Sequence, residues 1–385
     1  MVNGPLWCYF YAMKYVDNEN PMASMRFSCT QVSPNSLVYG TEDDLRKGLS
    51  SIETYAKPER VFVENNCSVS LVGDDVQGIA DQMDLPWPVY AMDSGGMKGS
   101  FEAGYSAASL RIEKAMKTKE KIPASVNVLG LSTVHMKGRE DAEEIRRLLS
   151  LCGIRVISMP GGGSNWEDIM DAPSASLNIV VRDELGLSLA KQMEQDFGTP
   201  YMSCGLPYGT DGTVAWLSEI IEKLGAGELT RASHEAAKLK EFLLRKGNNL
   251  ESLWGPLWFD AILISAPPSE ALGIAEAIRS EWIDTARLCI HAQCETEKST
   301  PAADAIRVVM KNEKEIAKDY EDWQGGLVLS SSHETHLFRR MGRSFTGFHI
   351  ALPSHDEVHF SDLPQCGLRG AGYLYEQLWN AKLRR

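Results

Sequence analysis

The sequence predicts an α/β fold built on mainly parallel sheets. Short β-branched or apolar runs alternate with segments of helical periodicity along all 385 residues, and this alternation is typical of parallel strands joined by crossover helices. Two of the runs, residues 125–131 and 177–181, are largely continuous in apolar character, as expected for strands buried on both faces. A chain of this length is expected to form two or three domains.

Residues 1–120 form the first predicted domain. Its strand candidates are residues 61–64 and 89–92. An early helix is predicted to open at Thr41, with Asp44 three residues on in a capping-box-like start. Its expected buried residues are Leu45, Leu49 and Ile52. A second helix face, between the two strands, consists of Val76, Ile79, Ala80 and Met83.

Residues 121–250 form the second predicted domain, with buried strands at 125–131, 154–159 and 177–181. A glycine turn at 161–163 precedes a second predicted capping box, Ser164 with Glu167. A mostly polar helical stretch near residues 214–246 is expected to close the domain.

Residues 251–385 form the third predicted domain. Its strand candidates are residues 261–265, 286–290, 327–330 and 348–352. Its final helix holds Tyr373, Leu374, Leu378 and Trp379. The chain is therefore predicted to consist of three Rossmann-like domains, and ligands are expected in clefts at the carboxyl ends of the strands.

Composition narrows the functional classes. The formal net charge of −13 argues against nucleic acid as a partner, because phosphate contacts need clustered Lys and Arg. No apolar run approaches the roughly 20 residues that span a bilayer, and the first residues lack the regions of a secretory signal. We therefore expect a cytoplasmic protein with no membrane partner. Its eight cysteines are expected to be reduced thiols, metal ligands or core residues.

Common ligand motifs are absent or ambiguous. No G-x-G-x-x-G follows a strand and no Walker lysine loop occurs, so we expect no nucleotide site in this chain. Residues 161–164 could present backbone amides to an anion, but a plain turn into a capped helix explains them equally well. His355 and His359 have the i, i+4 spacing of a helical metal site, whereas Pro353 and the polar residues around it favour a loop.

Two cysteines near the start of the chain carry more information. Cys8 follows the turn pair Gly4-Pro5, and Cys67 follows the strand predicted around residues 61–65. Thiolates at turns after strands can converge on one cluster, because loops expose the sulfurs and supply amide donors. A single cysteine after a strand is more often a small core residue. The residues alone leave both readings open.

The other cysteines have weaker claims to a ligand role. Cys152 and Cys289 lie in or beside apolar runs and are expected in the core. Cys204 and Cys366 fall near turns that would face an inter-domain cleft, and Cys294 follows a predicted strand.

Seven segments occur in the order found in one known family. Residues 4–8 (GPLWC) are similar to a GP-x-x-C element, and residues 26–45 to the stretch that follows it, in a version that can carry a cysteine at the place of Cys29. Residues 64–75 (ENNCSVSLVGDD) are similar to TTC-x-x-x-x-IGDD, the most specific element. The remaining segments are residues 94–105, 126–130, 197–201 and 367–373. Over essentially its whole length the chain resembles the nitrogenase component 1 type oxidoreductases.

The resemblance implies paired subunits of three Rossmann-like domains each. In this family an ATP-dependent iron protein docks and delivers electrons through a cysteine-ligated cluster at the subunit interface. By that resemblance the cofactor is an iron–sulfur cluster of the 4Fe–4S type, with Cys8 and Cys67 as ligands and Cys29 as a candidate third. The assembly is expected to be a homodimer or a heterotetramer with a related subunit.

The sequence departs from the family pattern in two places. Family members usually carry another cluster cysteine upstream of the GP-x-x-C element, where this chain begins. Fewer local ligands, substitution by Cys29 or by a partner chain, or loss of the first strand with its function would each account for this. Alignment on residues 197–200 places Arg182 where the nitrogenase α subunit has its cofactor cysteine. Arginine cannot ligate iron but can pair with an anionic substrate or cofactor, so no molybdenum–iron cofactor is expected.

Three functions remain open at this level. The first is an electron-transferring reductase component that acts on an unsaturated compound other than dinitrogen, such as a tetrapyrrole. Its cofactor- or substrate-binding candidates in the cleft are Arg182 and His349. The second is a non-catalytic scaffold or carrier for assembling a metallocofactor. The third is a β-like subunit that completes the interface for a catalytic partner.

Overall fold

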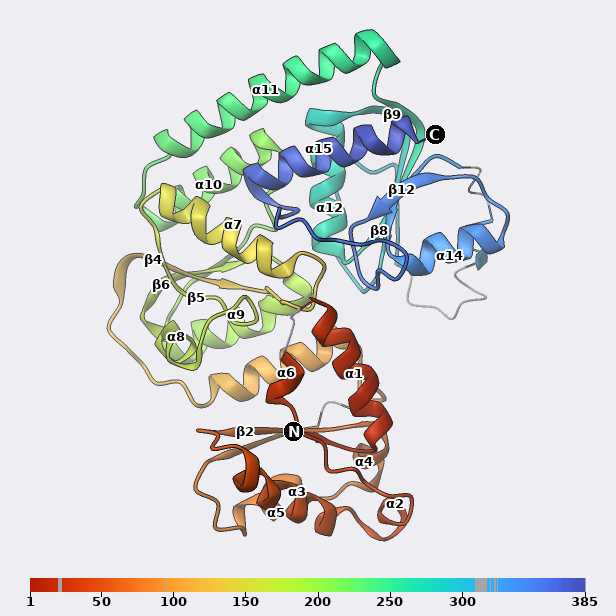
Figure 1. Ribbon diagram of the computed structural model, residues 1–385. Coiled ribbons are helices and arrows are strands. Elements are labelled where there is room, and N and C mark those ends of the chain that lie inside the picture. Colours follow the sequence, from red (N-terminus) through yellow and green to blue (C-terminus); the bar gives the residue numbers. More distant parts are fainter. Residues whose placement is uncertain are drawn as a thin grey trace. The chain divides into compact units, whose positions relative to one another are not determined.

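The computed structural model describes residues 1–19, 23–93, 95–308, 317–318, 320–321, 323 and 325–384. The chain divides into two compact units, Met1–Met116 and Lys117–Arg385, and each is described by itself (Figure 1). The residues described form three sheets, and every strand pair in them is parallel. The predicted α/β class with parallel sheets is confirmed.

The first unit is built on a three-stranded sheet of order β1-β2-β3. The strands are β1 (Val2–Asn3), β2 (Val61–Asn65) and β3 (Val89–Met92). β2 and β3 confirm the two predicted strands. β1 is too short to leave a sequence pattern, and it joins the sheet through the register Val2 to Glu64.

Helices surround this sheet. They are α1 (Leu6–Glu19), the 3₁₀ turn Ala23–Arg26, α2 (Ser36–Tyr39), α3 (Glu42–Tyr55), α4 (Cys67–Val72), α5 (Val76–Asp81) and α6 (Phe101–Glu113). The core lies between α3, α5 and the sheet and contains the predicted Leu45, Leu49 and Ile52. The helix predicted to open at Thr41 is confirmed, but the predicted capping box between Thr41 and Asp44 is not formed. The Thr41 hydroxyl donates instead to Asp74, at 2.8 Å.

The second unit begins with a four-stranded sheet of order β5-β4-β6-β7. The strands are β4 (Ile122–Leu129), β5 (Arg155–Ser158), β6 (Ala175–Val180) and β7 (Tyr201–Ser203). The first three confirm the predicted strands, whereas β7 has only three residues and was not predicted. The order in which strands are added reverses between β4 and β6, which makes the carboxyl ends of these strands a switch point of the sheet.

Five helices accompany this sheet: α7 (Gly138–Leu151), α8 (Trp166–Asp171), α9 (Asp183–Phe197), α10 (Thr210–Leu224) and α11 (Thr230–Trp254), with a 3₁₀ turn at Ala172–Ser174. A capping box does open α8, but one residue later than predicted, with Asn165 and Asp168. The Ser164 hydroxyl instead accepts the amide of Met159 at 2.8 Å. Residues 161–163 are the turn before this capped helix. The predicted polar stretch consists of two helices, α10 and α11.

The third sheet has the order β10-β9-β8-β11-β12. Its strands are β8 (Trp258–Ala266), β9 (Asp284–Ala292), β10 (Ala305–Val308), β11 (Leu327–Ser330) and β12 (Thr346–His349). Its helices are α12 (Pro268–Ala277), the π-helical turn Ile278–Trp282, α14 (Ser332–Arg340) and α15 (Gly367–Leu383). All four predicted strands are present, although β12 ends at His349 instead of continuing to residue 352. β10 was not predicted.

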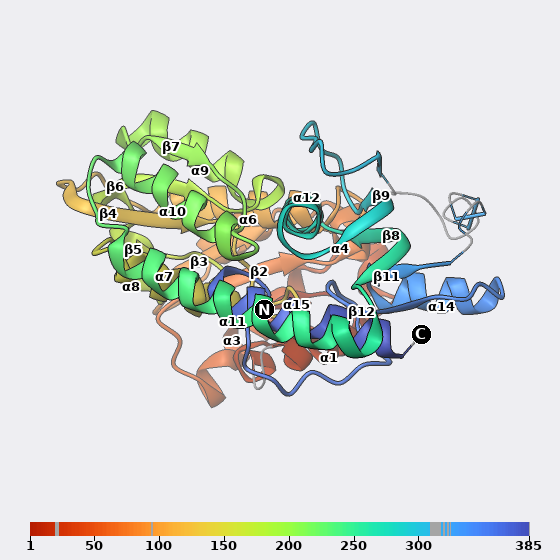
Figure 2. The same ribbon diagram turned by 90° about the horizontal axis from the view of Figure 1, so that it is seen from above.

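The second and third sheets share one hydrophobic core, with Val128 and Ile179 from one sheet and Ile264 and Ile290 from the other. α11 and α15 lie side by side (Figures 1 and 2). The α15 helix contacts α7 at the second sheet and β12 at the third, so it ties the two together. The predicted domain boundary at residue 250 falls inside α11. Among the described residues, no helix is long and apolar enough to cross a membrane.

Candidate functional site

Cys8 and Cys67 lie at one edge of the first unit's sheet. After β1 the chain turns at Gly4-Pro5 into α1, whose first turn contains Cys8. After β2 a single residue, Asn66, leads into α4, which begins at Cys67. Because β1 and β2 are adjacent and parallel, both thiols follow carboxyl ends of neighbouring strands, where ligands of such sheets bind. Both are exposed.

Asn66 connects the two cysteine loops. Its side-chain oxygen accepts the amide of Val69 at 3.0 Å, which caps α4. Its side-chain nitrogen donates to the sulfur of Cys8 at 3.3 Å. Gly4 permits this approach, since a Cβ atom at that position would lie 2.6 Å from the Asn66 side chain. Sequence reasoning missed Asn66, although an asparagine directly before a short helix is a recognisable N-cap signal.

Cys29 lies beside the same edge. It forms an isolated parallel bridge with Val2 of β1. Its thiol donates to the carbonyl of Gly4 at 3.2 Å, and its sulfur accepts the amide of Gln31 at 3.4 Å. Burial raises the pKa of the Cys29 thiol, and the neighbouring charge of Cys8 acts in the same direction. The three predicted ligands are thus all placed around Gly4 and Asn66.

Two glycines after β3, Gly95 and Gly96, lie close to the helix that begins at Cys67. A Cβ atom at Gly96 would lie 3.4 Å from the Cys67 sulfur, and one at Gly95 would lie 2.4 Å from the hydroxyl oxygen of Ser70. Glycines therefore let the loop after the third strand approach α4. The loops that follow all three strands of the unit therefore lie at the edge of the sheet that carries Cys8 and Cys67, here called the thiol edge.

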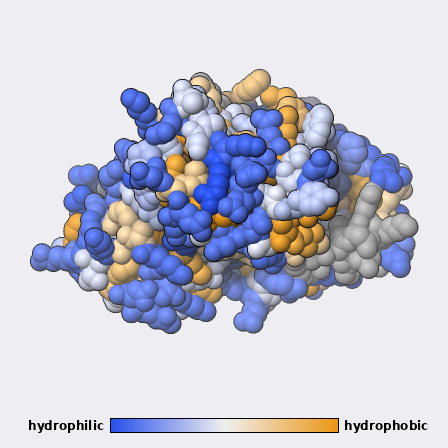
Figure 3. Space-filling model, turned by 90° about the horizontal axis from the view of Figure 1, so that it is seen from below, coloured by the Kyte–Doolittle hydropathy of each residue, from blue (hydrophilic) through white to orange (hydrophobic). Residues whose placement is uncertain are grey.

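Exposed apolar side chains accompany the thiols. Trp7 is 68% exposed, and its ring contacts those of Phe10 and Tyr11 on the same helix. Further exposed apolar residues of this unit are Leu6, Met25, Phe27, Val38, Tyr39, Tyr55, Leu71, Met97 and Phe101. On one face of the molecule, hydrophobic side chains reach the surface in separate patches among hydrophilic ones (Figure 3). Large contiguous apolar patches on a protein surface are typical of interaction sites.

Arg182 lies in the second unit, after β6, and is fully buried. Its guanidinium donates to one carboxylate oxygen of Glu270 at 2.6 and 2.9 Å and lies 3.9 Å from Asp141. Burial alone would raise the pKa of Glu270, but the charge of Arg182 and the hydrogen bond and charge of His135 together outweigh burial and hold that pKa below its ordinary value. The arginine charge is therefore balanced within the chain, at the carboxyl ends of β6 and β8.

His349 is the last residue of β12 and is 1% exposed. The Ser354 hydroxyl lies 2.7 Å from its Nδ1 and 3.1 Å from Nε2 of His359. The predicted loop around residues 353–359 is confirmed, because the segment contains neither helix nor strand. His359 is therefore brought to His349, and the i, i+4 spacing with His355 creates no shared helix face.

The remaining cysteines are mostly core residues. Cys152 and Cys289 are buried, as predicted, and so are Cys294 and Cys366. Cys204 lines an open cavity of about 570 Å³ between α10 and α12. Burial raises the pKa of the Cys204 thiol to about 12.

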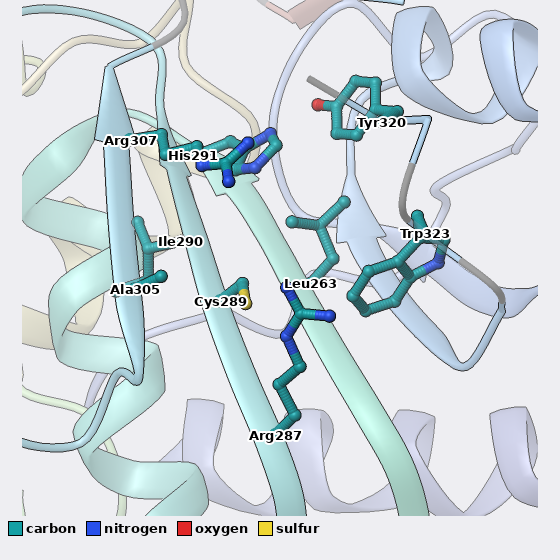
Figure 4. Close-up of a pocket in the computed structure, with 9 residues that line it drawn as sticks. All are labelled: Leu263, Arg287, Cys289, Ile290, His291, Ala305, Arg307, Tyr320 and Trp323. Atoms are coloured by element: carbon teal, nitrogen blue, oxygen red, sulfur yellow. The ribbon is translucent and has the colours of Figure 1, made fainter. Parts of the chain in front are cut away.

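A further pocket lies on the third sheet, where side chains of β8, β9 and β10 face Tyr320 and Trp323 (Figure 4). It includes Arg287 and Arg307, but its volume is about 30 Å³. Small-molecule sites occupy roughly 300–1,000 Å³, so this pocket suits a solvent molecule and no organic substrate.

The fold and the thiol edge together define a three-sheet parallel α/β protein with a cysteine site in its first unit. Residues 1–382 match the family described as nitrogenase component 1 type oxidoreductase, and the chain belongs to this family.

The named relatives have low sequence identity to this chain. A nitrogenase iron-molybdenum cofactor biosynthesis protein NifE of Clostridium pasteurianum is 29% identical over 259 residues, which are 66% of this chain and 54% of that protein. The match thus spans about half of that relative's length. One of the subunits of the light-independent protochlorophyllide reductase of Chloroherpeton thalassium is 23% identical over 92% of this chain and 69% of its own.

A solved structure supports the fold. The structure titled "Nitrogenase Cp1 at pH 6.5" superposes with a TM-score of 0.76 at 16% identity and covers 100% of this chain and 88% of its own. Identity this low bears on the fold alone.

Proposed function

We propose that this chain is a nitrogenase component 1-like oxidoreductase subunit. It accepts electrons from an ATP-dependent iron protein through an iron–sulfur cluster and passes them to a bound substrate other than dinitrogen. The observation that carries the proposal is the position of Cys8 and Cys67, both exposed and both following carboxyl ends of adjacent parallel strands.

The residues at this edge fit an iron–sulfur cluster. Cys8 and Cys67 supply accessible sulfurs, and Cys29 supplies a third from beside β1. The amide of Asn66 donates to the Cys8 sulfur, the kind of hydrogen bond that tunes cluster potentials. Gly95 and Gly96 keep the neighbouring loop close without side chains of their own. When bound, the cluster supplies one-electron transfer.

The protein's own residues would then position the cluster and hold its partners. Asn66 fixes the distance between the two cysteine loops, since it caps α4 and bonds to Cys8 at the same time. The exposed aromatic residues Trp7, Phe10 and Tyr11 lie within one turn of Cys8. They provide the apolar surface that a second component 1-type subunit, either the same chain or a related one, would cover. A subunit seated there would also exclude water from the cluster and add further ligands.

The substrate is expected to be something other than dinitrogen because Arg182 takes the place of a metal-binding cysteine. Its guanidinium is paired with Glu270, and arginine offers no lone pair to iron. An unsaturated organic compound remains the substrate class, with a tetrapyrrole as the specific proposal.

The test is metal analysis of the anaerobically purified full chain. Iron and acid-labile sulfide should be present, with an EPR signal on reduction, and addition of reduced iron protein with ATP should produce the same signal. Cys67→Ala and Cys8→Ala should each lose most of the iron. Cys204→Ser, a partly exposed thiol in the other unit, should keep it.

Protein that stays iron-free after anaerobic reconstitution would overturn the proposal. So would equal iron loss in Cys204→Ser and Cys67→Ala.

A scaffold or carrier for metallocofactor assembly is the second candidate. It is favoured by the similarity to a cofactor biosynthesis protein. A scaffold would release its metal cluster to an acceptor protein, whereas a relay would keep its cluster through repeated reduction. Iron that leaves the chain stoichiometrically on mixing with an apo-acceptor would select the scaffold.

A further inference from the structure

Two histidines and a glutamate meet at the end of β12, in the unit that does not contain the thiol edge. One ligand atom from each of His349, Glu357 and His359 lies within 4.8 Å of the other two. In the described parts of the chain, no other three His, Cys, Asp or Glu residues come together this closely. Nothing in the role proposed above uses this group.

The geometry of the group centres on one small volume. The Ser354 hydroxyl oxygen lies 2.7 Å from Nδ1 of His349 and 3.1 Å from Nε2 of His359. A Glu357 carboxylate oxygen lies 3.9 Å from Nε2 of His359, and the same oxygen accepts the His349 amide at 3.0 Å. Two imidazole nitrogens thus flank a single hydroxyl group, and a carboxylate oxygen lies within 4.8 Å of a ligand nitrogen of each histidine.

The other face of His349 is held as in protein metal sites. Its Nε2 lies 3.3 Å from a carboxylate oxygen of Asp356, and Asp356 is bonded in turn to Arg339. Metal-binding histidines almost always donate their second ring N–H to a carboxylate, a carbonyl or water, which leaves the first nitrogen's lone pair free for the ion. Asp356 would therefore direct Nδ1 of His349 toward Glu357 and His359.

Burial and access also suit an ion. His349 is buried, whereas Glu357 and His359 line an open cavity of about 290 Å³ that also includes Lys137 and Arg384. One wall of the site is rigid, because it is the end of a strand, and the other is open to solvent. Two neutral imidazoles and one carboxylate leave a divalent cation with a net positive charge and free coordination positions.

We propose that His349, Glu357 and His359 bind one divalent transition-metal ion, Zn²⁺ or Fe²⁺, with Asp356 positioning His349. Two histidines and one carboxylate are a ligand set that both ions use in open sites. Ligand distances of roughly 2.0–2.2 Å require the three side chains to close in slightly, while the Ser354 hydroxyl turns aside or becomes a further ligand.

The experiment is an anaerobic Co²⁺ titration of the metal-free full chain carrying Cys8→Ser, Cys29→Ser and Cys67→Ser, so that the thiol edge does not compete. We expect one equivalent of Co²⁺ with visible d–d bands and no sulfur-to-cobalt charge transfer. Competition with Zn²⁺ and with Fe²⁺, together with the metal content of the purified protein, then distinguishes the two ions.

Variants of the same loop supply the controls. Glu357→Gln and His359→Ala should weaken Co²⁺ binding at least 10-fold, and Asp356→Asn should weaken it about 10-fold. His355→Ala removes an exposed histidine of the same loop and should bind like the parent. Thermal unfolding without metal should be the same for His355→Ala and His359→Ala, which shows that folding is not the cause.

Two results would overturn the proposal: no bound equivalent of Co²⁺, or the same affinity in His359→Ala as in the parent. Neither result would bear on the cysteine cluster, whose ligands are absent from this background.

Discussion

The side-chain nitrogen of Asn66 lies 3.3 Å from the sulfur of Cys8, while its side-chain oxygen caps the helix that begins at Cys67. One residue therefore sets the geometry of two loops that are 58 residues apart in sequence. The strands supply the frame, because β1 and β2 end side by side. The asparagine converts that proximity into a defined arrangement of two thiols.

Replacing Asn66 should separate capping from sulfur bonding. Asn66→Asp keeps an oxygen for the Val69 amide but places a negative charge where Cys8 has a donor. We expect stability close to that of the wild type, lower iron content and a more negative cluster potential, because donors to the sulfurs raise the potential. Asn66→Ala should lose both functions, at a cost of about 1 kcal/mol in unfolding free energy.

Asp75→Ala is the matched control. It removes the side-chain cap of α5, in which the Asp75 carboxylate accepts the Gly78 amide, and it changes no contact of a thiol. Its unfolding free energy should fall by about 1 kcal/mol with iron content unchanged. Denaturant titration and redox potentiometry measure the two effects, and an unaltered potential in Asn66→Asp would contradict the assigned role of the hydrogen bond.

The Arg182–Glu270 ion pair should contribute strongly to the stability of the second unit. Arg182→Met leaves the buried Glu270 charge without its partner, and such a loss typically costs about 3–5 kcal/mol. Combining Arg182→Met with Glu270→Gln should restore part of the stability. Arg139→Met, in an exposed pair with Glu143, should change the unfolding free energy by less than about 1 kcal/mol. Urea unfolding of both single variants, the double variant and Arg139→Met completes this comparison, and additive effects in the double variant would argue against a direct pair.

The buried carboxyl of Asp141, beside Arg182, should make the free energy of unfolding depend on pH. Burial raises the pKa of Asp141 to about 6, although Arg182 and the amides of Cys366 and Gln365 act against it. The folded state thus binds this proton more tightly than the unfolded state does. The contribution is present below about pH 4 and is lost as pH rises toward 6.

Asp141→Asn should remove this dependence. Relative to the variant, the wild type should lose up to roughly 1.4 kcal/mol per pH unit between about pH 4 and 6. The exposed Glu222→Gln should leave the pH profile unchanged. Parallel profiles for wild type and Asp141→Asn, measured by denaturant unfolding across that range, would refute the assignment.

Much of the fold could be predicted from the sequence because long apolar strands leave a strong local signal. All nine predicted strands are present. The strands β1 and β7, with two and three residues, are too short to produce a pattern, and the four-residue β10 was missed as well. The capping boxes were harder to predict, since a Thr or Ser with a nearby acid can bond elsewhere. Thr41 bonds to Asp74, 33 residues away.

The candidate sites were harder to predict than the strands, because they depend more on contacts between residues far apart in the sequence. Cys8 and Cys67 were found through family motifs, and their common edge follows from strand order. The pairing of His349 with His359, and the partnership of Arg182 with Glu270 across 88 residues, depend on tertiary packing. A helical spacing rule instead paired His359 with His355, which only a helix would have brought together.

The exposed aromatic residues of α1 lead to a final prediction, about assembly. Trp7 and Tyr11 stack on each other and are 68% and 64% exposed. Aromatic side chains of this kind contribute about 2 kcal/mol or more when an interface covers them. Trp7→Ser combined with Tyr11→Ser should therefore weaken subunit association roughly 30-fold or more, by the usual conversion of about 1.4 kcal/mol per factor of ten. The unfolding free energy of the isolated chain should change by less than about 1 kcal/mol, since neither ring is buried in it.

A matched substitution in the other unit tests whether this loss is specific to α1. Phe242→Ser, which removes an exposed aromatic residue of α11, should leave association unaltered. Sedimentation velocity over a range of concentrations, with the chain alone and with a related subunit, measures the effect. Equal weakening by Phe242→Ser would show that the loss is not specific to the surface beside Cys8, and unchanged association in the double variant would place the interface elsewhere.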